Sequence, residues 1–366
     1  LTEIIKIIFQ KQMTSERGII SNFIKNYSPL LFHIFLHPYP VFLKMTEITK
    51  KIDIAVSEIL KGNVVALPTE TVYGLGANGL NENAVLKIYE VKKRPHFNPL
   101  ILHIHSIEDF KNFAKHIPEE VYKLAESYSP GPITFVLEKK SKINDIATAG
   151  LDSVAIRFPL HKMFRKVLKE SKVPIAAPSA NMFGRISPVT ARDVYKELKG
   201  KINYILDGGK CKVGIESTVI SFLNDRIKIL RPGFITQNDI EKVIGYKLKG
   251  QRKKKNKTGK KYLSPGMLKN HYAPLTPLYI VEDLNSLTKI SKQNFYHIDL
   301  SMYKNLKSVA SNLFKEFRKA DEKKYDFITI QKVENTGLGI AINDRIEKAS
   351  TGNIEMISSK SNSYLI

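Results

Sequence analysis

The sequence is poor in cysteine and in acidic side chains. Its 366 residues include one cysteine, Cys211, which excludes a disulfide framework and a zinc site built from cysteines. A single thiol fits a reducing compartment, and we expect a cytoplasmic protein. Lysine and arginine number 58 against 35 acidic residues, giving a formal net charge of +23. This balance indicates phosphate-bearing partners or a bias of composition throughout the chain, and both interpretations stay open.

Several catalytic motifs are also missing. The sequence has no GxxxxGK[ST] phosphate loop, no HExxH zinc motif, no GxSxG nucleophile elbow and no nucleophilic cysteine pair. Covalent catalysis is therefore not indicated. With no obvious general base either, any rate enhancement would come from positioning and charge stabilisation.

Long apolar runs are absent as well. A bilayer span takes ~20 residues, and the apolar stretch within residues 1–44 is interrupted by His33, His37, Pro38 and Pro40. We therefore expect no membrane partner. Two interpretations of this N-terminal extension stay open: an organellar presequence, or a segment upstream of the true start.

From Met45 onward, apolar runs rich in β-branched residues alternate with helical patterns, which is typical of α/β domains. We predict a large α/β domain over residues 45–246, a basic linker over 247–277 and a smaller α/β domain over 278–366. The predicted strands are 64–69, 99–105, 133–138, 154–159, 174–179, 217–222, 227–232, 278–281, 295–300 and 327–331; the predicted helices are 81–93, 107–128, 162–171, 190–199 and 302–319.

Gly74, Gly76 and Gly79 have the spacing of a dinucleotide-binding fingerprint. That fingerprint requires its first glycine at the strand end and an acidic residue roughly 20 positions later. Here PTETVY separates the strand from the first glycine, and the later region is the basic run Lys92 to Arg94. We therefore interpret the segment as something other than a dinucleotide loop.

Hydroxyl, amide and basic side chains recur at strand ends, where α/β sheets hold ligands. Arg157 interrupts an apolar strand, so its guanidinium must meet either a ligand carboxylate or a carboxylate of the protein. Ser179 and Asn181 could cap a helix or bind a nucleotide or amino acid. The same pattern occurs at Thr69 and Thr71, Lys92 and Arg94, Ser217 and Thr218, and Arg231.

Taken in order, the segments PTETVYGLGANG, KKRPHFNPLILHI, SPGPITFVL, VAIRFP, APSANMFGRISP, GIESTVI and LRPG resemble the YrdC-like family of threonylcarbamoyl-AMP synthases. SPGMLKNHYAP (264–274) and TGLGIAINDRIEKAS resemble the linker and C-terminal domain of the family's two-domain form. The resemblance implies a YrdC-like twisted, mixed sheet with a concave basic ligand face. It also implies a second, smaller Rossmann-like α/β domain.

The resemblance implies an enzyme, a nucleotidyltransferase that condenses L-threonine, bicarbonate and ATP, with a divalent cation such as Mg²⁺, to threonylcarbamoyl-AMP and pyrophosphate. The product would serve tRNA modification beside the anticodon through separate transferase machinery. The carbamate of threonine would attack the α-phosphate by in-line displacement, which needs cations more than a nucleophilic side chain.

The resemblance also implies roles for individual residues. Lys92 and Arg94 form the implied catalytic pair, and no protein metal ligand is implied. The implied threonine contacts are Thr71, His103, Arg157, Ser179 and Ser217. The implied ATP contacts are Lys92, Arg94, Asn98, Ser153, Asn181, Ser187, Arg231 and, from the linker, Tyr272.

One alternative from another class stays open, a non-catalytic basic RNA-binding protein. The net charge and the run KKKNKTGKK would permit it, and RNA affinity stays open as an accessory property. This alternative does not account for Arg157 or for the pair Ser179 and Asn181. The sequence also lacks aromatic-interleaved RNA motifs.

Overall fold

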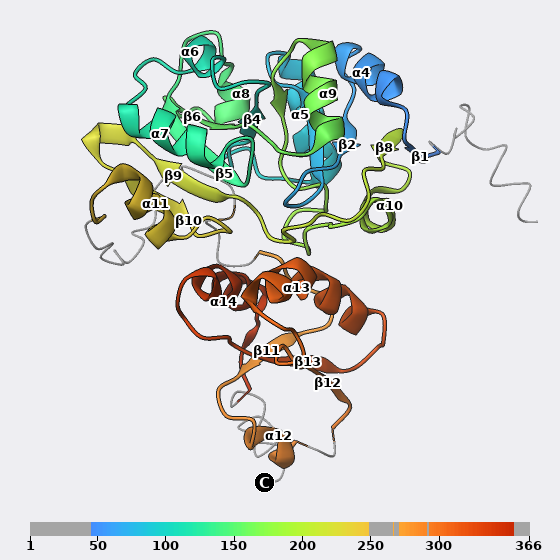
Figure 1. Cartoon of the computed structure of the whole chain (residues 1–366). Coiled ribbons are helices and arrows are strands. Elements are labelled where there is room, and N and C mark those ends of the chain that lie inside the picture. Colours follow the sequence, from blue (N-terminus) through green and yellow to red (C-terminus); the bar gives the residue numbers. More distant parts are fainter. Residues whose placement is uncertain (1–44, 249–265, 267–270, 291–292, 355–366) are drawn as a thin grey trace, which may run out of the picture. The chain divides into compact units, whose positions relative to one another are not determined.

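The structure is a computed structural model that describes residues 45–248, 266, 271–290 and 293–354 (Figure 1). The predictions for residues 1–44 and for most of the linker, 249–265 and 267–270, lie outside these residues. A ten-stranded mixed sheet is followed by a four-stranded parallel sheet. The α/β fold class with a second, smaller domain is therefore confirmed. None of the described helices is long and apolar enough to cross a membrane.

The larger sheet contains parallel and antiparallel neighbours in the order β1-β8-β2-β3-β7-β4-β6-β5-β9-β10. Its strands are β1 (Glu47–Thr49), β2 (Val65–Leu67), β3 (Gly74–Asn78), β4 (Ile101–His103), β5 (Ile133–Glu138), β6 (Ser153–Arg157), β7 (Ile175–Ala176), β8 (Tyr204–Leu206), β9 (Thr218–Ser221) and β10 (Lys228–Arg231). The associated helices are α4 (Ile52–Leu60), α5 (Glu82–Lys92), α6 (Phe110–Phe113), α7 (Glu119–Tyr128), α8 (Asp145–Thr148), α9 (Lys162–Ser171), α10 (Ala191–Leu198), η1 (Leu223–Asp225) and α11 (Gln237–Ile244).

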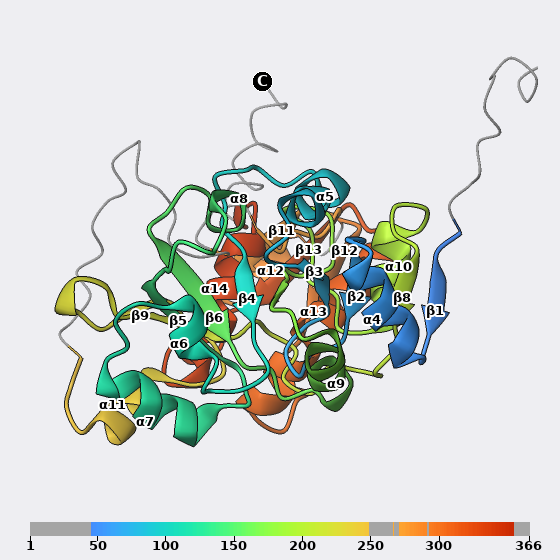
Figure 2. The same ribbon diagram turned by 90° about the horizontal axis from the view of Figure 1, so that it is seen from above.

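Helices cover both faces of this sheet because successive residues of its strands point to opposite sides. Val65 and Leu67 of β2 pack into one core with α4 and α9, which contact each other (Figure 2). Ala66, between them, belongs to the core on the opposite face, together with Val85 of α5 and Val121 of α7. The polar strand ends are thereby left as the place for a ligand.

The glycines of the fingerprint-like segment belong to strand β3 and the turn after it. A Cβ on Gly76 would lie 2.7 Å from Leu67 Cδ1 and 2.9 Å from Ile175 Cγ2. A Cβ on Gly79 would lie 2.4 Å from Leu102 Cδ1. These glycines therefore allow close packing of neighbouring strands, and the interpretation against a dinucleotide loop is confirmed. Strand β3 itself was not predicted, because a glycine-rich run resembles a turn.

The predicted helix 107–128 is wrong as a single element. It is divided into α6 and α7 by the segment from Ala114, which is extended with φ −109° and ψ 150°, to Pro118, which precedes α7. Proline lacks an N–H and disfavours helical geometry in the residue before it, so one helix cannot run through this point. The other predicted strands and helices of this domain are found, whereas β1, β8, α4, α8, η1 and α11 were not predicted.

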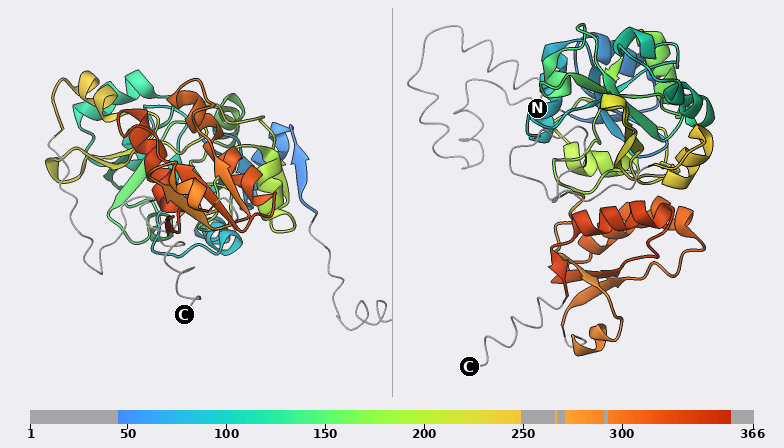
Figure 3. Two further views of the ribbon diagram at one scale, coloured as in Figure 1. Left: turned by 90° about the horizontal axis from the view of Figure 1, so that it is seen from below. Right: turned by 90° about the vertical axis from the view of Figure 1, so that its left-hand side faces the viewer.

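The second domain has a four-stranded parallel sheet in the order β12-β13-β11-β14. Its elements are β11 (Leu278–Val281), α12 (Ser286–Lys289), β12 (Phe295–Ile298), α13 (Leu306–Asp321), β13 (Phe327–Gln331), α14 (Leu338–Ala349) and β14 (Gly352–Asn353). Helices α13 and α14 lie together along one face of this sheet (Figure 3). The predicted helix 302–319 begins later, at Leu306, because Asn305 caps its N-terminus through Ser308 N at 2.9 Å.

Residues of α13 and α14 share a hydrophobic core with the larger domain. Leu313 and Ile342 belong to the same buried cluster as Val194 of α10. Arg318 of α13 adds polar contacts, donating to Glu197 Oε1 at 3.2 Å and to the carbonyl of Ile186 at 2.5 Å. The second domain is thus joined to the first by apolar packing and by the polar contacts of the partly buried Arg318.

We predict that Gly76→Ala will destabilise the protein by ~1–3 kcal/mol, because the new methyl group must displace Leu67 and Ile175. Gly74→Ala on the same strand is the matched control. Its Cβ would lie 3.2 Å from Ala177 Cβ, a contact that a small shift relieves, so we expect a smaller loss. Urea unfolding checks both variants, and equal unfolding midpoints would contradict the packing argument.

Candidate active site

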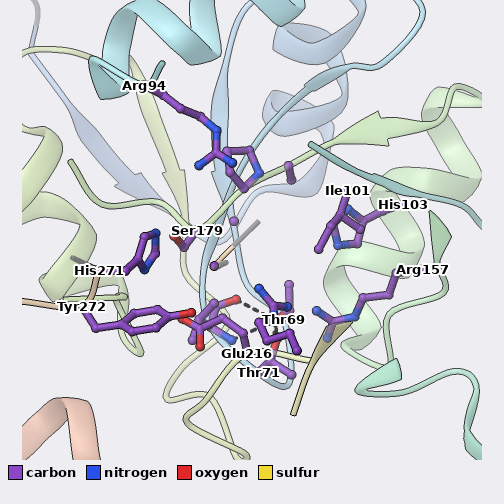
Figure 4. A pocket seen from close by; sticks show the side chains of 16 residues that line it. Thr69, Thr71, Arg94, Ile101, His103, Arg157, Ser179, Glu216, His271 and Tyr272 are labelled. Carbon is purple, nitrogen blue, oxygen red and sulfur yellow. Dashed lines mark hydrogen bonds between the residues drawn. The ribbon is translucent and has the colours of Figure 1, made fainter. Parts of the chain in front are cut away.

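A pocket lies where loops and strand ends of the larger domain meet two short pieces of the linker (Figure 4). In this view His103 and Arg157 occupy one side, with His271 and Tyr272 opposite them. Its 16 lining residues are Thr69, Thr71, Val72, Gly74, Arg94, Ile101, His103, Arg157, Ala177, Pro178, Ser179, Glu216, Arg231, Gly266, His271 and Tyr272.

Many residues singled out in the sequence converge here from distant segments. Of the predicted ligand contacts, those lining the pocket are Thr71, Arg94, His103, Arg157, Ser179, Arg231 and Tyr272. The remaining predicted contacts do not line it: Lys92, Asn98, Ser153, Asn181, Ser187 and Ser217. Of these, Ser153 begins β6 whereas Arg157 ends it, so the two are separated by the length of that strand. The roles assigned to all these residues stay predictions.

Arg157 is held by a carboxylate of the protein. Its Nη2 donates to Glu70 Oε1 at 2.6 Å, and its Nε donates to the carbonyl of Gly131 at 3.3 Å. Glu70 Oε2 also accepts from the backbone N–H of Leu160 at 3.0 Å, and both side chains of the ion pair are 5% exposed. Of the two alternatives for Arg157, the protein carboxylate is present, and the guanidinium still borders the pocket. Sequence reasoning assigned no role to Glu70, although it lies between Thr69 and Thr71.

Lys92 lies behind the pocket wall. Its Nζ donates to the carbonyl of Ser179 at 2.6 Å and also to the carbonyl of Asn181. Burial, followed by the charge of Arg94, holds the pKa of Lys92 well below its usual value. In this geometry Lys92 fixes the turn that carries Ser179 and Asn181.

Arg94 presents its guanidinium to the pocket from the end of α5. Its Nε donates to the carbonyl of Asn98 at 3.1 Å and its Nη2 to that of Pro99 at 3.0 Å. Burial lowers its pKa to about 10, which leaves the group cationic at neutral pH. With Arg157 and Arg231, the lining residues carry three arginines against one carboxylate, that of Glu216. The pocket therefore favours anionic ligands.

Several buried polar atoms around the pocket have no hydrogen-bond partner among the described residues. They are both side-chain amide atoms of Asn98, Asn181 Oδ1, His271 Nδ1 and the hydroxyl of Tyr272. Buried polar groups in proteins are nearly always paired, and His271 and Tyr272 line the pocket, so their unpaired atoms indicate a polar ligand there. Asn98, Asn181 and Tyr272 are residues for which the motifs imply ATP contacts.

Tyr272 enters the pocket in a constrained conformation. Its φ of +68° is unusual for a bulky residue, and its side chain is fully buried. The ring packs edge-on against His271, with centroids 4.2 Å apart. It also contacts Phe314 of α13 in a tilted arrangement, with centroids 5.4 Å apart. A Cβ on Gly266 would lie 2.8 Å from the Tyr272 hydroxyl, so only glycine leaves room for the ring here.

Glu216 is a pocket residue that sequence reasoning did not single out. Its Oε1 accepts from Ser187 at 2.5 Å, and its Oε2 accepts from Arg345 Nε of α14 at 3.0 Å. Burial alone would raise the pKa of this carboxyl, but Arg345 and Arg231 hold it below its usual value. The only signal in the sequence was its place before Ser217 in the GIESTVI motif.

Two family models match consecutive parts of the chain. The first, described as telomere recombination, matches residues 57–233, and the second, the C-terminal domain of threonylcarbamoyl-AMP synthase, matches residues 235–351. The threonylcarbamoyl-AMP synthase of Pyrococcus abyssi is 41% identical over 320 residues, which cover 82% of this chain and 94% of that protein. The chain belongs to the threonylcarbamoyl-AMP synthase family.

Other relatives agree with this assignment. The Bacillus subtilis threonylcarbamoyl-AMP synthase is 40% identical over 325 residues, covering 82% of this chain and 93% of that protein. The crystal structure of P. abyssi Sua5 complexed with L-threonine is similar with a TM-score of 0.76 and 40% identity, covering 84% of this chain and 97% of that chain. The predicted family, its two-domain form and a nucleotidyltransferase-type activity are confirmed.

We predict that stability falls as the pH drops from 7 to 5, in part through His103. Burial, followed by Arg157, lowers its pKa from 6.5 to about 3, so only the unfolded chain binds this proton between those values. Linkage then removes ~2 kcal/mol of unfolding free energy between pH 7 and pH 5. The measurement is chemical unfolding at both pH values for the wild type and His103→Gln. Equal losses in the two proteins would contradict the role of His103.

Proposed function

We propose that the protein synthesises threonylcarbamoyl-AMP from L-threonine, bicarbonate and ATP, releasing pyrophosphate. The observation that carries this proposal is the pocket itself: three arginines from distant segments surround one cavity in a chain of the synthase family. Arg94, Arg157 and Arg231 give it the charge needed for a polyphosphate and a carboxylate together.

Two subsites follow from the positions of these residues along β4 and β6. Threonine would occupy the end of the pocket near His103 and Arg157, where these two strands finish. Its carboxylate would face Arg157, which Glu70 holds in place. ATP would lie toward Arg94 and the unpaired amide of Asn98, which precede β4. Ile101, which begins β4, also lines the pocket.

The reaction then requires no nucleophilic side chain. The amine of threonine combines with bicarbonate to form a carbamate and water. A carbamate oxygen forms a bond to the α-phosphorus as the bond to the β-phosphate oxygen breaks, and pyrophosphate leaves with that electron pair. Arg94 and Arg231, both in the pocket wall, would stabilise the charge that develops on the phosphate oxygens.

A divalent cation is proposed as part of the ATP substrate. No group of three or more histidine, cysteine or acidic side chains suited to a metal occurs among the described residues. The one lining carboxylate, Glu216, already accepts from Ser187 and Arg345. A lining with this one carboxylate fits a cation whose ligands are chiefly the phosphate oxygens of ATP, as is common for Mg²⁺. It would neutralise phosphate charge, while the arginines orient the phosphates.

His271 and Tyr272 are proposed as the cover of the nucleotide. Both are buried, border the pocket and carry unpaired polar atoms, so a bound nucleotide would lie against their rings. Tyr272 also packs on Phe314, so this cover rests on the second domain.

The wider setting is also part of the proposal. The adenylate would pass to separate transferase machinery that modifies tRNA beside the anticodon, in the cytoplasm. Direct RNA affinity would be an accessory property of the basic surface.

The test of the proposed function is pyrophosphate release from ATP and bicarbonate, with and without L-threonine, with mass detection of the adenylate. We expect release that requires threonine and an adenylate of the corresponding mass. Threonine-independent release would point to a different acceptor. No release with any divalent cation, together with salt-sensitive RNA binding, would favour the RNA-binding alternative.

We predict that Tyr272→Phe will raise the KM for ATP about tenfold. The reason is the loss of one hydrogen bond to the nucleotide, which is worth about 1.4 kcal/mol. Because this hydroxyl has no partner among the described residues, thermal stability should stay unchanged or rise. Tyr303→Phe is the matched control, since its hydroxyl donates to Glu316 Oε1 at 2.8 Å and does not line the pocket. The control should lose stability and keep its KM. The reverse pattern would refute the nucleotide contact.

A further inference from the structure

Arg345, from helix α14 of the second domain, contacts Glu216, one of the residues that line the pocket. Its side chain is completely buried. Its Nε donates to Glu216 Oε2 at 3.0 Å, and its Nη2 donates to the carbonyl of Glu216 at 3.4 Å. Nη1 donates to the carbonyl of Pro232 at 2.6 Å and to Asp344 Oδ2 at 3.0 Å. One guanidinium thus joins two segments of the larger domain.

Those two segments are next to predicted ligand contacts. Glu216 precedes Ser217, and Pro232 follows Arg231. Arg231 itself donates from Nε to the carbonyl of Ser217 at 3.0 Å and from Nη2 to Ser217 Oγ at 3.1 Å. Arg345 therefore bonds the residues next to β9 and β10, the pair of strands that presents Arg231 to the pocket.

Arg345 also controls the charge and the aromatic wall of the pocket. Without it, the buried carboxylate of Glu216 would attract Arg231 and reduce the positive charge available to phosphates. Its guanidinium carbon lies 5.6 Å from the ring centroid of Tyr272, within the range of a cation–π contact. Burial alone would lower the pKa of Arg345, but Tyr272, Glu216 and Asp344 raise it, so the group stays charged.

We propose that Arg345 is a positioning residue for the nucleotide end of this pocket, acting through Glu216 and Tyr272. The catalytic domain then acquires its full affinity for an adenine nucleotide only when the second domain supplies this guanidinium. The proposal rests on the proposed function, because it takes ATP to be the ligand of this end.

The chain offers a matched control in Arg318. This arginine also connects the domains, through Glu197, the carbonyl of Ile186 and Asp193 at 3.8 Å. None of these partners lines the pocket. Arg318→Met therefore removes an interdomain arginine without touching the pocket wall, whereas Arg345→Met removes one that holds the lining residue Glu216. Arg345→Lys keeps the charge but loses the planar fork that bonds both segments.

The experiment measures kcat, the KM for ATP and for threonine, ATP affinity by calorimetry, and thermal stability in each variant. For Arg345→Met we expect at least a tenfold loss of kcat/KM for ATP and of ATP affinity, with threonine KM within threefold. Arg345→Lys should lie between Arg345→Met and the wild type, and it provides the test if the methionine variant does not fold. Arg318→Met should lose stability but keep kcat and both KM values within twofold.

A double variant tests the route through Glu216. If Arg345 acts by holding that carboxylate, Glu216→Gln combined with Arg345→Met should lose no more ATP affinity than Arg345→Met alone. Additive losses would contradict that route. Equal kinetic losses in Arg345→Met and Arg318→Met, in proportion to their stability losses, would overturn the proposal. If the wild type releases no pyrophosphate, the proposed function fails, whereas ATP calorimetry still tests Arg345.

Discussion

Several cationic guanidinium groups are buried around one cavity, and the rest of the structure must compensate their charge. A buried charge is costly unless hydrogen bonds and opposite charges compensate it. Arg94 is bonded to two backbone carbonyls, and Arg231 to the carbonyl and hydroxyl of Ser217. Carbonyl dipoles orient an arginine without cancelling its charge. The loops after the strands are thus shaped to hold cations in place and leave the pocket positive.

Few carboxylates lie near these arginines, and each accepts hydrogen bonds from at least two donors. Glu70 bonds Arg157 and a backbone N–H, while Glu216 bonds Ser187 and Arg345. A carboxylate with two donors of its own competes less for a neighbouring arginine. This explains how a pocket with a buried Glu216 can still favour an anion, and why one of the donors comes from the second domain.

The sequence was most informative where residues act through local patterns. Alternating strands and helices predicted the fold class, and family motifs predicted most of the arginines around the pocket. Glu216 and Arg345 were not identified because their contact joins residues 129 positions apart. Strand β3 was missed since its glycines serve packing against Leu67 and Ile175, which lie on other strands. In each case the decisive contact joins residues that are far apart in the sequence, so the local spacing of residues does not predict it.

The unpaired polar atoms connect stability to binding. Each buried donor or acceptor left without a partner costs ~1–3 kcal/mol, and these atoms gather at Asn98, Asn181, His271 and Tyr272. A ligand that bonds them recovers this cost when it binds. Because His271 and Tyr272 line the pocket, a ligand that bonds them would stabilise this part of the linker. The same arrangement would disfavour a ligand that fills the space but lacks polar edges, since it would leave these groups unpaired.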